Sequence, residues 1–229
     1  MLASIYSQTP ALLIIFSYLG CLLILAELLN RHLKTDAELT RKIVHIGSGN
    51  VILLAWWLNI TADIILLAAL VASTIAVMSY YVPILPSVNS VGRRSLGTLF
   101  YAISIGILTL LFWREDTKLF TILGILIMSY GDGLAALIGQ KWGRHPYILW
   151  GNKKSWEGSL TMFFVSMIIT LLLLPLTGDG WYNYPLISAT VAITATFLEI
   201  FSFIGIDNLT VPVFTSVLAY CLQQLAQPL

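Results

Sequence analysis

The chain has 229 residues, of which 58% are hydrophobic and only 10% are charged, and its formal net charge is +1. This composition exceeds what the core of a water-soluble domain requires and is typical of a protein that folds in a lipid bilayer. A net charge so close to zero gives no general attraction to nucleic acid, so we expect no nucleic-acid partner. The composition predicts an all-α, polytopic transmembrane protein whose electrostatic function depends on where its few charges lie.

Stretches of about 20 apolar residues, the length that crosses a bilayer as a helix, occur along the whole chain. We expect about eight spans, with seven as the alternative because the last is short, contains Pro212 and ends near two glutamines. No repeat or soluble domain is visible, so we interpret residues 1–229 as a single membrane domain. The predicted spans are residues 9–29, 43–60, 63–82, 96–113, 118–139, 158–176, 185–204 and 209–226.

Basic residues lie in alternate connections between these spans. The connections after the first, third and fifth spans hold all of the 12 lysines and arginines except Arg114 and Lys118. Because cytoplasmic loops are enriched in Lys and Arg, this asymmetry predicts that the N-terminus lies outside the cytoplasm or its organellar equivalent. We expect a multi-pass protein of a bacterial cell, thylakoid or plastid membrane, with its site facing the cytoplasm or the equivalent compartment.

The second predicted span opens with a basic motif, Arg41-Lys42-x-x-His45. Residues four apart share one face of a helix, so Arg41 and His45 would lie together at the same side of the membrane. A lone histidine is more often a hydrogen-bonded packing residue, and that alternative stays open for His45. Arg94 lies just before the fourth span and is a candidate site residue. An arginine that only extends to the level of the lipid headgroups is an equal alternative.

Asp132 lies inside the fifth predicted span, where an ionised side chain costs at least about 2.5–3.5 kcal/mol. Gly131 and Gly139 on the same helix would let a ligand approach its backbone closely. Gly139 and Gly143 also match the GxxxG spacing of simple helix packing. We therefore predict a binding crevice at Asp132, with a purely structural aspartate as the alternative.

The longest polar connection, residues 140–158, follows this span and places several cations beside the buried carboxylate. A long connection is more often functional than not, and this combination suits an anionic ligand carried with a divalent metal. An ordinary basic loop that binds anionic lipid headgroups is the alternative. The candidate phosphate-binding residues here are Arg144, Lys153, Lys154, Ser155 and Gly158.

Two further acidic positions complete the set of candidate site residues. Glu199 is near the end of the seventh predicted span, and Asp207-Asn208 lie in the turn that follows it. With eight spans these groups face the same side as Asp132, which predicts a site for one or two Mg²⁺ ions. A structural role is the alternative for Glu199 and for Asp207. The gathering of carboxylates and cations at one membrane face predicts transfer of a phosphoryl or nucleotidyl group between a nucleotide and a lipid.

The same residues resemble the family of membrane polyprenol kinases that includes phytol kinase and dolichol kinase, itself similar to phosphatidate cytidylyltransferases. The resemblance covers residues 41 to about 212, so the first predicted span lies outside it. It implies CTP as phosphoryl donor, Mg²⁺ as cofactor, membrane lipids as surroundings, and a prenyl alcohol as acceptor, above all phytol, with farnesol and geranylgeraniol as others. The matching motifs are Arg41-Lys42-x-x-His45, Gly131-Asp132-x-x-Ala135, Gly139, Gly143, Lys154-Ser155-x-Glu157-Gly158-Ser159 and Asp207-Asn208.

This resemblance implies a role for each matching residue. Asp132 would bind the metal or activate the alcohol, with His45 and Asp207 as the other candidates for the general base. Glu157 would orient the lysines of the loop or cap the sixth helix. Together with the buried acids and basic residues described above, the candidate metal ligands are Asp132, Glu199, Asp207 and Asn208, and the candidate nucleotide-binding residues are Arg41, Lys42, Arg94, Gly131, Gly139, Gly143, Arg144, Lys153, Lys154, Ser155 and Gly158.

Two other functions stay open on the sequence. A cytidylyltransferase could make a CDP-lipid from the same crevice, although the short chain and the Arg41-Lys42-x-x-His45 motif favour the kinase. An ion-coupled transporter or a lipid-binding membrane protein could also bury Asp132 and Glu199. Against that class, the ionisable groups gather at one face instead of forming a pathway through the membrane.

Overall fold

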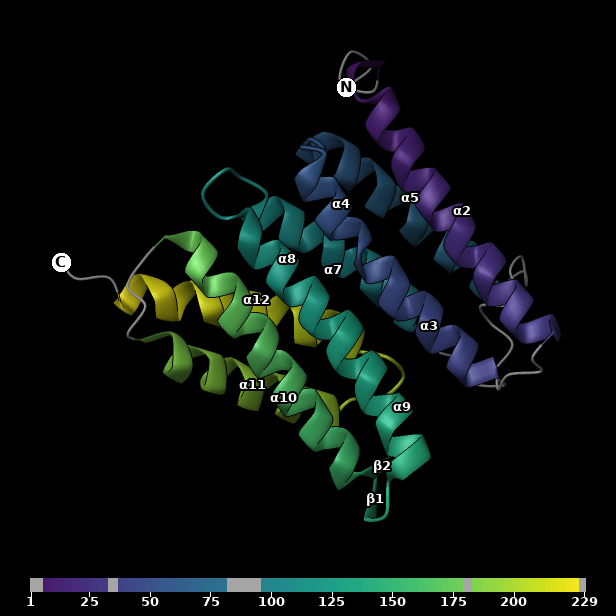
Figure 1. Ribbon diagram of the computed structural model, residues 1–229, viewed down its shortest axis with the longest axis vertical. Helices are drawn as coiled ribbons and strands as arrows, with labels where there is room; N and C mark the ends of the chain where they lie inside the picture. Colours follow the sequence, from purple (N-terminus) through teal and green to yellow (C-terminus); the bar gives the residue numbers. More distant parts are fainter. Residues whose placement is uncertain (1–5, 33–36, 82–95, 179–182, 227–229) are drawn as a thin grey trace.

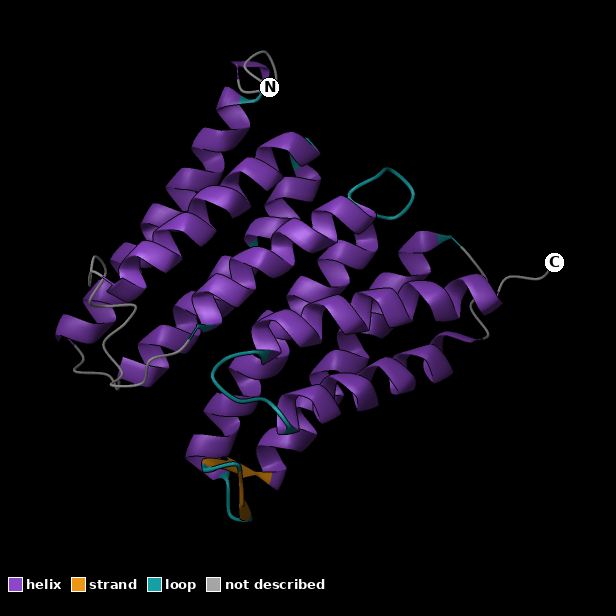
Figure 2. Ribbon diagram, turned by 180° about the vertical axis from the view of Figure 1, so that it is seen from behind, coloured by secondary structure: helices purple, strands orange, loops and turns teal. Residues whose placement is uncertain are grey.

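The computed structural model describes residues 6–32, 37–81, 96–178 and 183–226, and in these ranges the chain is a bundle of helices with one short β-hairpin (Figure 1, Figure 2). A π-helix, η1 (Ile127–Asp132), joins α8 to α9, and a 3-10 helix, η2 (Leu174–Thr177), follows α10. The α-helices are α2 (Thr9–His32), α3 (Ala37–Gly49), α4 (Val51–Trp57), α5 (Ala62–Tyr81), α7 (Gly97–Phe112), α8 (Lys118–Leu126), α9 (Gly133–Trp142), α10 (Trp156–Leu173), α11 (Tyr184–Ile200) and α12 (Asp207–Ala226).

Several of these helices have the length and composition of membrane spans. Within the described ranges, five helical stretches are long and apolar enough to cross a bilayer: α2, α5, the continuous α8–η1–α9, α10 with η2, and α12. Two further apolar helices, α7 and α11, are shorter. The last predicted span, which the sequence made the weakest, therefore has a full-length counterpart in α12.

The second predicted span, residues 43–60, differs most from the expectation. Helix α3 begins earlier, at Ala37, and the chain leaves regular helix at Asn50 before α4 resumes for seven residues. The preceding Gly47, Ser48 and Gly49 have little preference for helix. The Asn50 side chain is bound instead by hydroxyl groups of two neighbouring helices, so the break coincides with a polar contact inside the bundle.

The stretch from Lys118 to Trp142 is the central helix of the bundle. In its apolar stretch 61% of the residues are buried, whereas only 17% are buried in the corresponding stretches of α2 and α5. Side chains such as Ile122 and Met128 are completely enclosed. Gly124 allows α12 to approach, because a Cβ at this position would collide with the backbone oxygen of Pro212. In its middle the central helix widens into η1, a feature that the sequence did not predict.

The predicted loop 140–158 contains the one element of β structure in the described chain, a short hairpin that adds to the predicted helical bundle. Strands β1 (Pro146–Leu149) and β2 (Asn152–Ser155) pair in antiparallel register, with Tyr147 opposite Lys154. Pro146 cannot continue α9, and Trp150 and Gly151 close the hairpin with positive φ angles of 47° and 78°. Two positive φ values in a two-residue loop define a type I′ turn, which fits the twist of paired strands.

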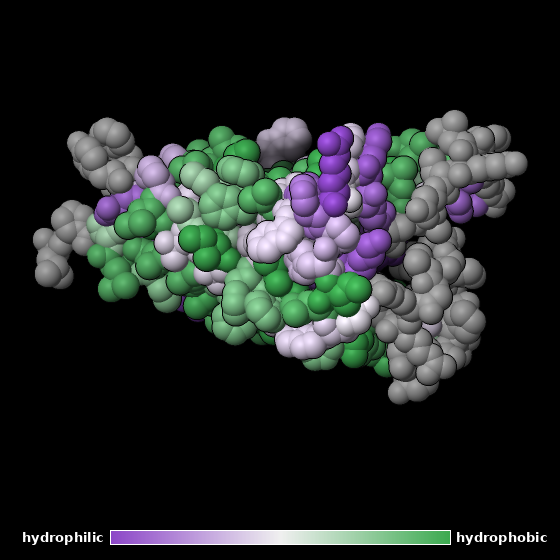
Figure 3. All heavy atoms as spheres, turned by 90° about the horizontal axis from the view of Figure 1, so that it is seen from below, coloured by the Kyte–Doolittle hydropathy of each residue, from purple (hydrophilic) through white to green (hydrophobic). Residues whose placement is uncertain are grey.

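The hairpin and α9 lie together at the lower end of the bundle in Figure 1. Seen from that end, hydrophilic side chains form one patch in the middle of the face, and hydrophobic side chains lie next to it (Figure 3). The remainder of the bundle exposes large apolar residues on α2, α5, α10 and α11, such as Phe16, Leu70, Leu172 and Leu186. A face of this composition suits one end of a protein whose sides contact lipid.

Candidate active site

A close contact between predicted site residues joins α3 to the end of η1. Lys42 Nζ donates a hydrogen bond to Asp132 Oδ2 at 2.6 Å. The two side chains are only 6% and 14% exposed, and the charge of the half-buried Arg41 also acts on Asp132. A carboxylate so enclosed is stable only with a paired cation, so Lys42 and Asp132 form one unit.

His45 completes this unit one turn farther along α3. Its Nε2 lies 3.7 Å from Asp132 Oδ2, and this buried nitrogen has no hydrogen-bond partner among the described residues. The ring lies tilted against Tyr101, with 5.4 Å between centroids. In the tautomer that carries its proton on Nδ1, Nε2 offers a free lone pair. A buried nitrogen without a partner is rare and marks a place where a ligand group can bind.

A polar network that the sequence analysis missed continues from this unit into the bundle. The Tyr101 hydroxyl lies 3.1 Å from Ser129 Oγ. Tyr130 donates from its hydroxyl to Asn50 Oδ1 at 2.8 Å, and the Asn50 amide donates to the Tyr18 hydroxyl at 3.3 Å. An amide inside an apolar run was the available signal, since a buried amide requires partners. The network ties α2, the break between α3 and α4, α7 and η1 together beside His45.

A second ionic group forms where β2 meets the α11–α12 connection. Lys154 Nζ donates to Glu199 Oε1 at 2.7 Å, to the Glu199 backbone oxygen and to Ser202 Oγ at 3.2 Å. Ser202 Oγ in turn donates to Asp207 Oδ2 at 3.1 Å, and the backbone and side-chain amides of Asn208 donate to Asp207 Oδ1. Glu199, Ser202 and Asp207 are all buried. Asp207 is therefore held by neutral donors, whereas Glu199 is held by a lysine.

The two ionic groups are neighbours. The charges of Asp132, Glu199 and Asp207 act on one another, and the charge of Lys42 acts on Asp207. Residues from α3, η1, β2, α11 and α12 thus contribute to one charged region at the end of the bundle that holds the hairpin. In this region each carboxylate already has a hydrogen-bond donor.

The start of α10 orders the hairpin beneath these groups. Ser155 is the N-cap residue, and its Oγ accepts a hydrogen bond from the Gly158 backbone N–H at 3.1 Å. Glu157 accepts from the backbone N–H of His145 and lies 2.7 Å from its Nδ1. Glu157 therefore fastens the beginning of the hairpin to α10 and, in the described residues, does not orient the lysines. Burial raises the pKa of the Tyr147 hydroxyl on the same hairpin.

The predicted glycines serve close packing where α9 meets α10. A Cβ added at Gly139 or Gly143 would come within 2.9 Å of the Ser155 side chain, and one at Gly158 would meet the backbone oxygen of Ala135 at 2.9 Å. Such contacts leave no room for a ligand against these glycines. The helix-packing alternative therefore accounts for Gly139 and Gly143, and Gly158 serves the same packing.

Other predicted residues lie apart from the two ionic groups. Arg144 and Lys153 are exposed on the loop, and alternation along β2 points Lys153 away from the side that Lys154 occupies. Gly131 faces α10, where a Cβ would press on the Met162 sulfur. Arg94 falls outside the described residues.

The carboxylates do not form a ready metal cage. Among the described residues, no three or more His, Cys, Asp or Glu side chains are arranged to hold a metal ion. The physical reason is that Lys42 and Lys154 neutralise Asp132 and Glu199 directly. The expected four-residue set of metal ligands is thus not preassembled. A Mg²⁺ ion that arrives on nucleotide phosphates needs only one or two protein carboxylates, and Asp207, bonded to neutral donors, is the one suited to such an ion.

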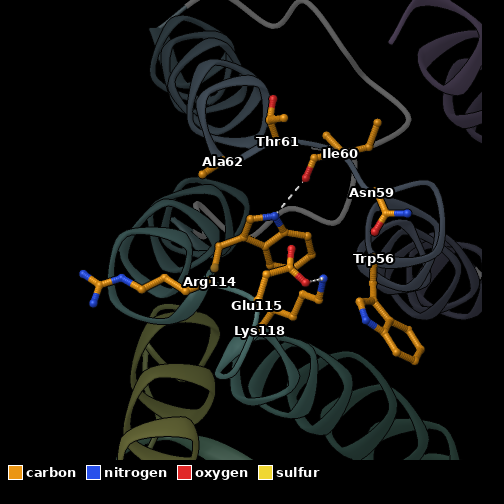
Figure 4. A pocket seen from close by; sticks show the side chains of 9 residues that line it. Trp56, Asn59, Ile60, Thr61, Ala62, Arg114, Glu115 and Lys118 are labelled. Carbon is orange, nitrogen blue, oxygen red and sulfur yellow. Dashed lines mark hydrogen bonds and ion pairs between the residues drawn. The ribbon is translucent and has the colours of Figure 1, made fainter. Parts of the chain in front are cut away.

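A cavity of about 200 Å³ lies at the opposite end of the bundle, between the α4–α5 and α7–α8 connections (Figure 4). Its lining includes Trp56, Trp113 and Lys118. Trp113 Nε1 donates to the Ile60 backbone oxygen at 2.9 Å, and Lys118 pairs with Glu115 at 2.9 Å. Two pairs of polar groups in this cavity therefore bind each other, and the unpartnered His45 nitrogen is not in its lining.

Comparison with known proteins gives a consistent set of relatives. Residues 1–206 match the cytidylyltransferase family. The phytol kinase of Synechocystis sp. is 51% identical over 204 residues, which cover 89% of this chain and 88% of that protein. A probable chloroplastic phytol kinase of Triticum aestivum is 29% identical over 81% of this chain and 67% of its own length. Chloroplastic phytol kinase 1 of Arabidopsis thaliana is 28% identical over 85% of this chain and 69% of its own length.

These comparisons correct one expectation. The family match begins at residue 1, so the first span belongs to the resemblance from which the sequence analysis excluded it. Tyr18 of this span contacts Asn50 in the network beside His45, which gives the span a structural reason to be included. No solved structure matches the chain.

Proposed function

The chain belongs to the cytidylyltransferase family, and within it we propose that the protein is a kinase that transfers the γ-phosphoryl group of CTP to phytol. The names of the relatives support the alcohol and the reaction type, and the family match supports a cytidine nucleotide as donor. The observation that carries the proposal is the unit of Lys42, Asp132 and His45, in which a buried nitrogen without a partner lies beside a paired carboxylate.

In the proposed reaction His45 is the general base. The alcohol hydroxyl donates to Nε2, the proton moves to this nitrogen, and the alcohol oxygen forms a bond to the γ-phosphorus as the bond to the β-phosphate oxygen breaks. CDP leaves with the electron pair of that bond. Asp132, 3.7 Å from Nε2, stabilises the imidazolium that forms. We favour His45 over Asp132 as the base because Lys42 already donates to the Asp132 oxygen at 2.6 Å.

The triphosphate binds on the hairpin side of this unit. Lys154 supplies a fixed charge next to Ser202 and Asp207, and the exposed Arg144 neutralises outer phosphate oxygens. Lys153, on the other side of β2, takes no part. Mg²⁺ bound to the phosphates would be held by Asp207, with Asn208 beside it, and would neutralise charge on the transferred group. The prenyl chain stays in the lipid next to the bundle.

The same proposal places the chain in the membrane. We infer eight crossings, with α3 and α4 together as the second, and an N-terminus outside the cytoplasm or its equivalent. Residues 140–158 then form the catalytic loop of a single membrane domain, on the side rich in Lys and Arg. A cyanobacterial relative and chloroplastic relatives are compatible with a bacterial cell, thylakoid or plastid membrane.

The test is product formation by the purified protein with Mg²⁺ and phytol, comparing CTP labelled at the γ-phosphate with CTP labelled at the α-phosphate. We expect lipid-phase label from the γ position alone. Asp132→Asn should abolish transfer, and Asp116→Asn, the same change in the exposed α7–α8 connection, should retain it.

The second candidate is a cytidylyltransferase, which the family match favours. Such an enzyme would attach the α-phosphate of CTP to phosphatidate and release pyrophosphate. Label in the lipid from the α position, with phosphatidate supplied, would establish this activity and overturn the kinase proposal. Absence of transfer to any lipid acceptor would overturn both.

A further inference from the structure

Two turns at the hairpin end of the bundle share an uncommon backbone conformation. Trp150 and Gly151 have φ angles of 47° and 78°, and Ile204 and Gly205 have φ angles of 55° and 87°. The Ile206 N–H donates to the Phe203 backbone oxygen at 3.1 Å, so the second turn is also of type I′. In both turns a bulky side chain occupies the left-handed position where Asn, Asp or Gly is usual. A side chain there carries steric strain, and such strain is concentrated at functional sites.

The two turns contact each other through aromatic rings. The Trp150 ring meets Phe201 at 5.7 Å and Phe203 at 5.8 Å between centroids, both in edge-to-face geometry. The Asn152 amide also donates to the Ser202 backbone oxygen at 3.4 Å. Trp150 still exposes 62% of its surface, so these contacts hold the indole in place and leave room on it for another ring.

This aromatic surface is continuous with the ionic group of Lys154. Ser202, which accepts a hydrogen bond from Lys154 Nζ and donates to Asp207, lies between the two phenylalanines that hold the indole. Lys154 follows Trp150 by four positions, so the two residues lie at most roughly 13 Å apart at 3.3 Å per residue. An exposed aromatic face next to fixed cations is the arrangement that binds the base and the phosphates of a nucleotide together.

We propose that Trp150 is a base-stacking residue: its indole, fixed by Phe201 and Phe203, stacks on the pyrimidine ring of the nucleotide whose phosphates lie at Lys154. This inference rests on the proposed function for the identity of the nucleotide. Trp150 supplies affinity for the base and takes no part in phosphoryl transfer. A tryptophan that only anchors the hairpin in the headgroup layer is the competing explanation.

The strained turn provides a sharp test. Trp150→Asn removes the ring and places a residue that favours the left-handed conformation, so the variant should fold at least as well as the parent. We expect the KM for CTP to rise about tenfold, within the effect of losing one base–aromatic stack. The inhibition constant of inorganic tripolyphosphate, which has phosphates and no base, should stay within about twofold. Trp150→Phe should keep most of the affinity.

Ile204→Asn is the matched control, because it relieves the same backbone strain on the same face and removes no aromatic ring. It should leave the KM for CTP unchanged. The proposal is overturned if Trp150→Asn leaves this KM unchanged, as a lipid anchor would, or if it weakens tripolyphosphate as much as CTP, as a structural defect would. An equal rise for both asparagine variants would also overturn it.

Failure of the proposed function is distinguishable from failure of this inference. If the parent protein transfers no phosphate, the kinase proposal fails, and binding alone then decides the role of the indole. Stacking on Trp150 predicts that CTP quenches part of the tryptophan emission and that Trp150→Phe removes this part. Quenching that is unaltered in the variant, or absent in the parent, would overturn the stacking proposal.

Discussion

Breaking the ion pair between Lys42 and Asp132 should destabilise the protein far more than breaking a surface pair. At 2.6 Å, two unit charges attract by about 6 kcal/mol at an effective dielectric constant of about 20, an attraction that offsets their desolvation. Lys42→Met leaves Asp132 buried without its cation, and we expect a loss of about 3–5 kcal/mol in the free energy of unfolding. The measurement is unfolding in mixed detergent micelles, with transfer activity assayed in parallel.

The chain offers a matched control in Lys118, which pairs with Glu115 at 2.9 Å. Glu115 is 88% exposed, and exposed pairs contribute about 0–1 kcal/mol, so Lys118→Met should change stability little. Adding Asp132→Asn to Lys42→Met removes the unpaired charge and should restore most of the stability while activity stays absent. Equal losses for Lys42→Met and Lys118→Met, or no recovery in the double variant, would refute the reasoning.

Three further predictions follow from contacts in the same region. His45→Gln should lower kcat for phytol phosphorylation about 10²- to 10⁴-fold, the usual contribution of a general base, with little change in the KM for CTP; a kcat within threefold of the parent would contradict the assignment. Lys154→Met leaves Glu199 buried without its cation and should lower the free energy of chemical unfolding by about 3–5 kcal/mol. Lys153→Met, on the exposed side of β2, should change it by no more than about 0.5 kcal/mol. Similar losses for the two variants would show that the Lys154 network does not contribute to stability. Gly158→Ala places a Cβ within 2.9 Å of the Ala135 backbone oxygen and should lower the free energy of unfolding by about 1–3 kcal/mol. Gly20→Ala, where nothing lies within 4 Å, should be neutral or slightly stabilising. Thermal unfolding of the two variants makes the comparison.

The sequence was informative wherever a single side chain contradicted its surroundings. Asp132 stands out in an apolar span, and the structure places Lys42 and His45 of the basic motif beside it. Helical spacing predicts that Arg41 and His45 share a face, but it cannot predict that Lys42, between them, reaches a carboxylate 90 positions later. That choice depends on how α3 packs against η1, which is a tertiary effect.

Features that depend on backbone geometry were predicted poorly. The hairpin consists of two four-residue strands and a Trp-Gly turn, and the usual Asn-Gly signal for such a turn is absent. The break at Asn50 and the π-helix leave no periodic trace, because each interrupts the α-helix over only a short stretch. The three-carboxylate metal site failed as a preassembled cage for a different reason: charge counting identified the acids but not the lysines that already neutralise them.

The π-helix changes the direction in which the later side chains of the central helix point. A residue in an α-helix advances the side-chain direction by about 100°, and a π turn inserts one residue into that count. Residues before η1 can therefore face α12, and Asp132 at its end can face α3, although one straight helix carries both. Deleting a single residue from Ile127–Asp132 would turn α9 by about the same angle and carry the carboxylate away from Lys42. The position of the acid is thus encoded in the length of the helix as much as in its composition.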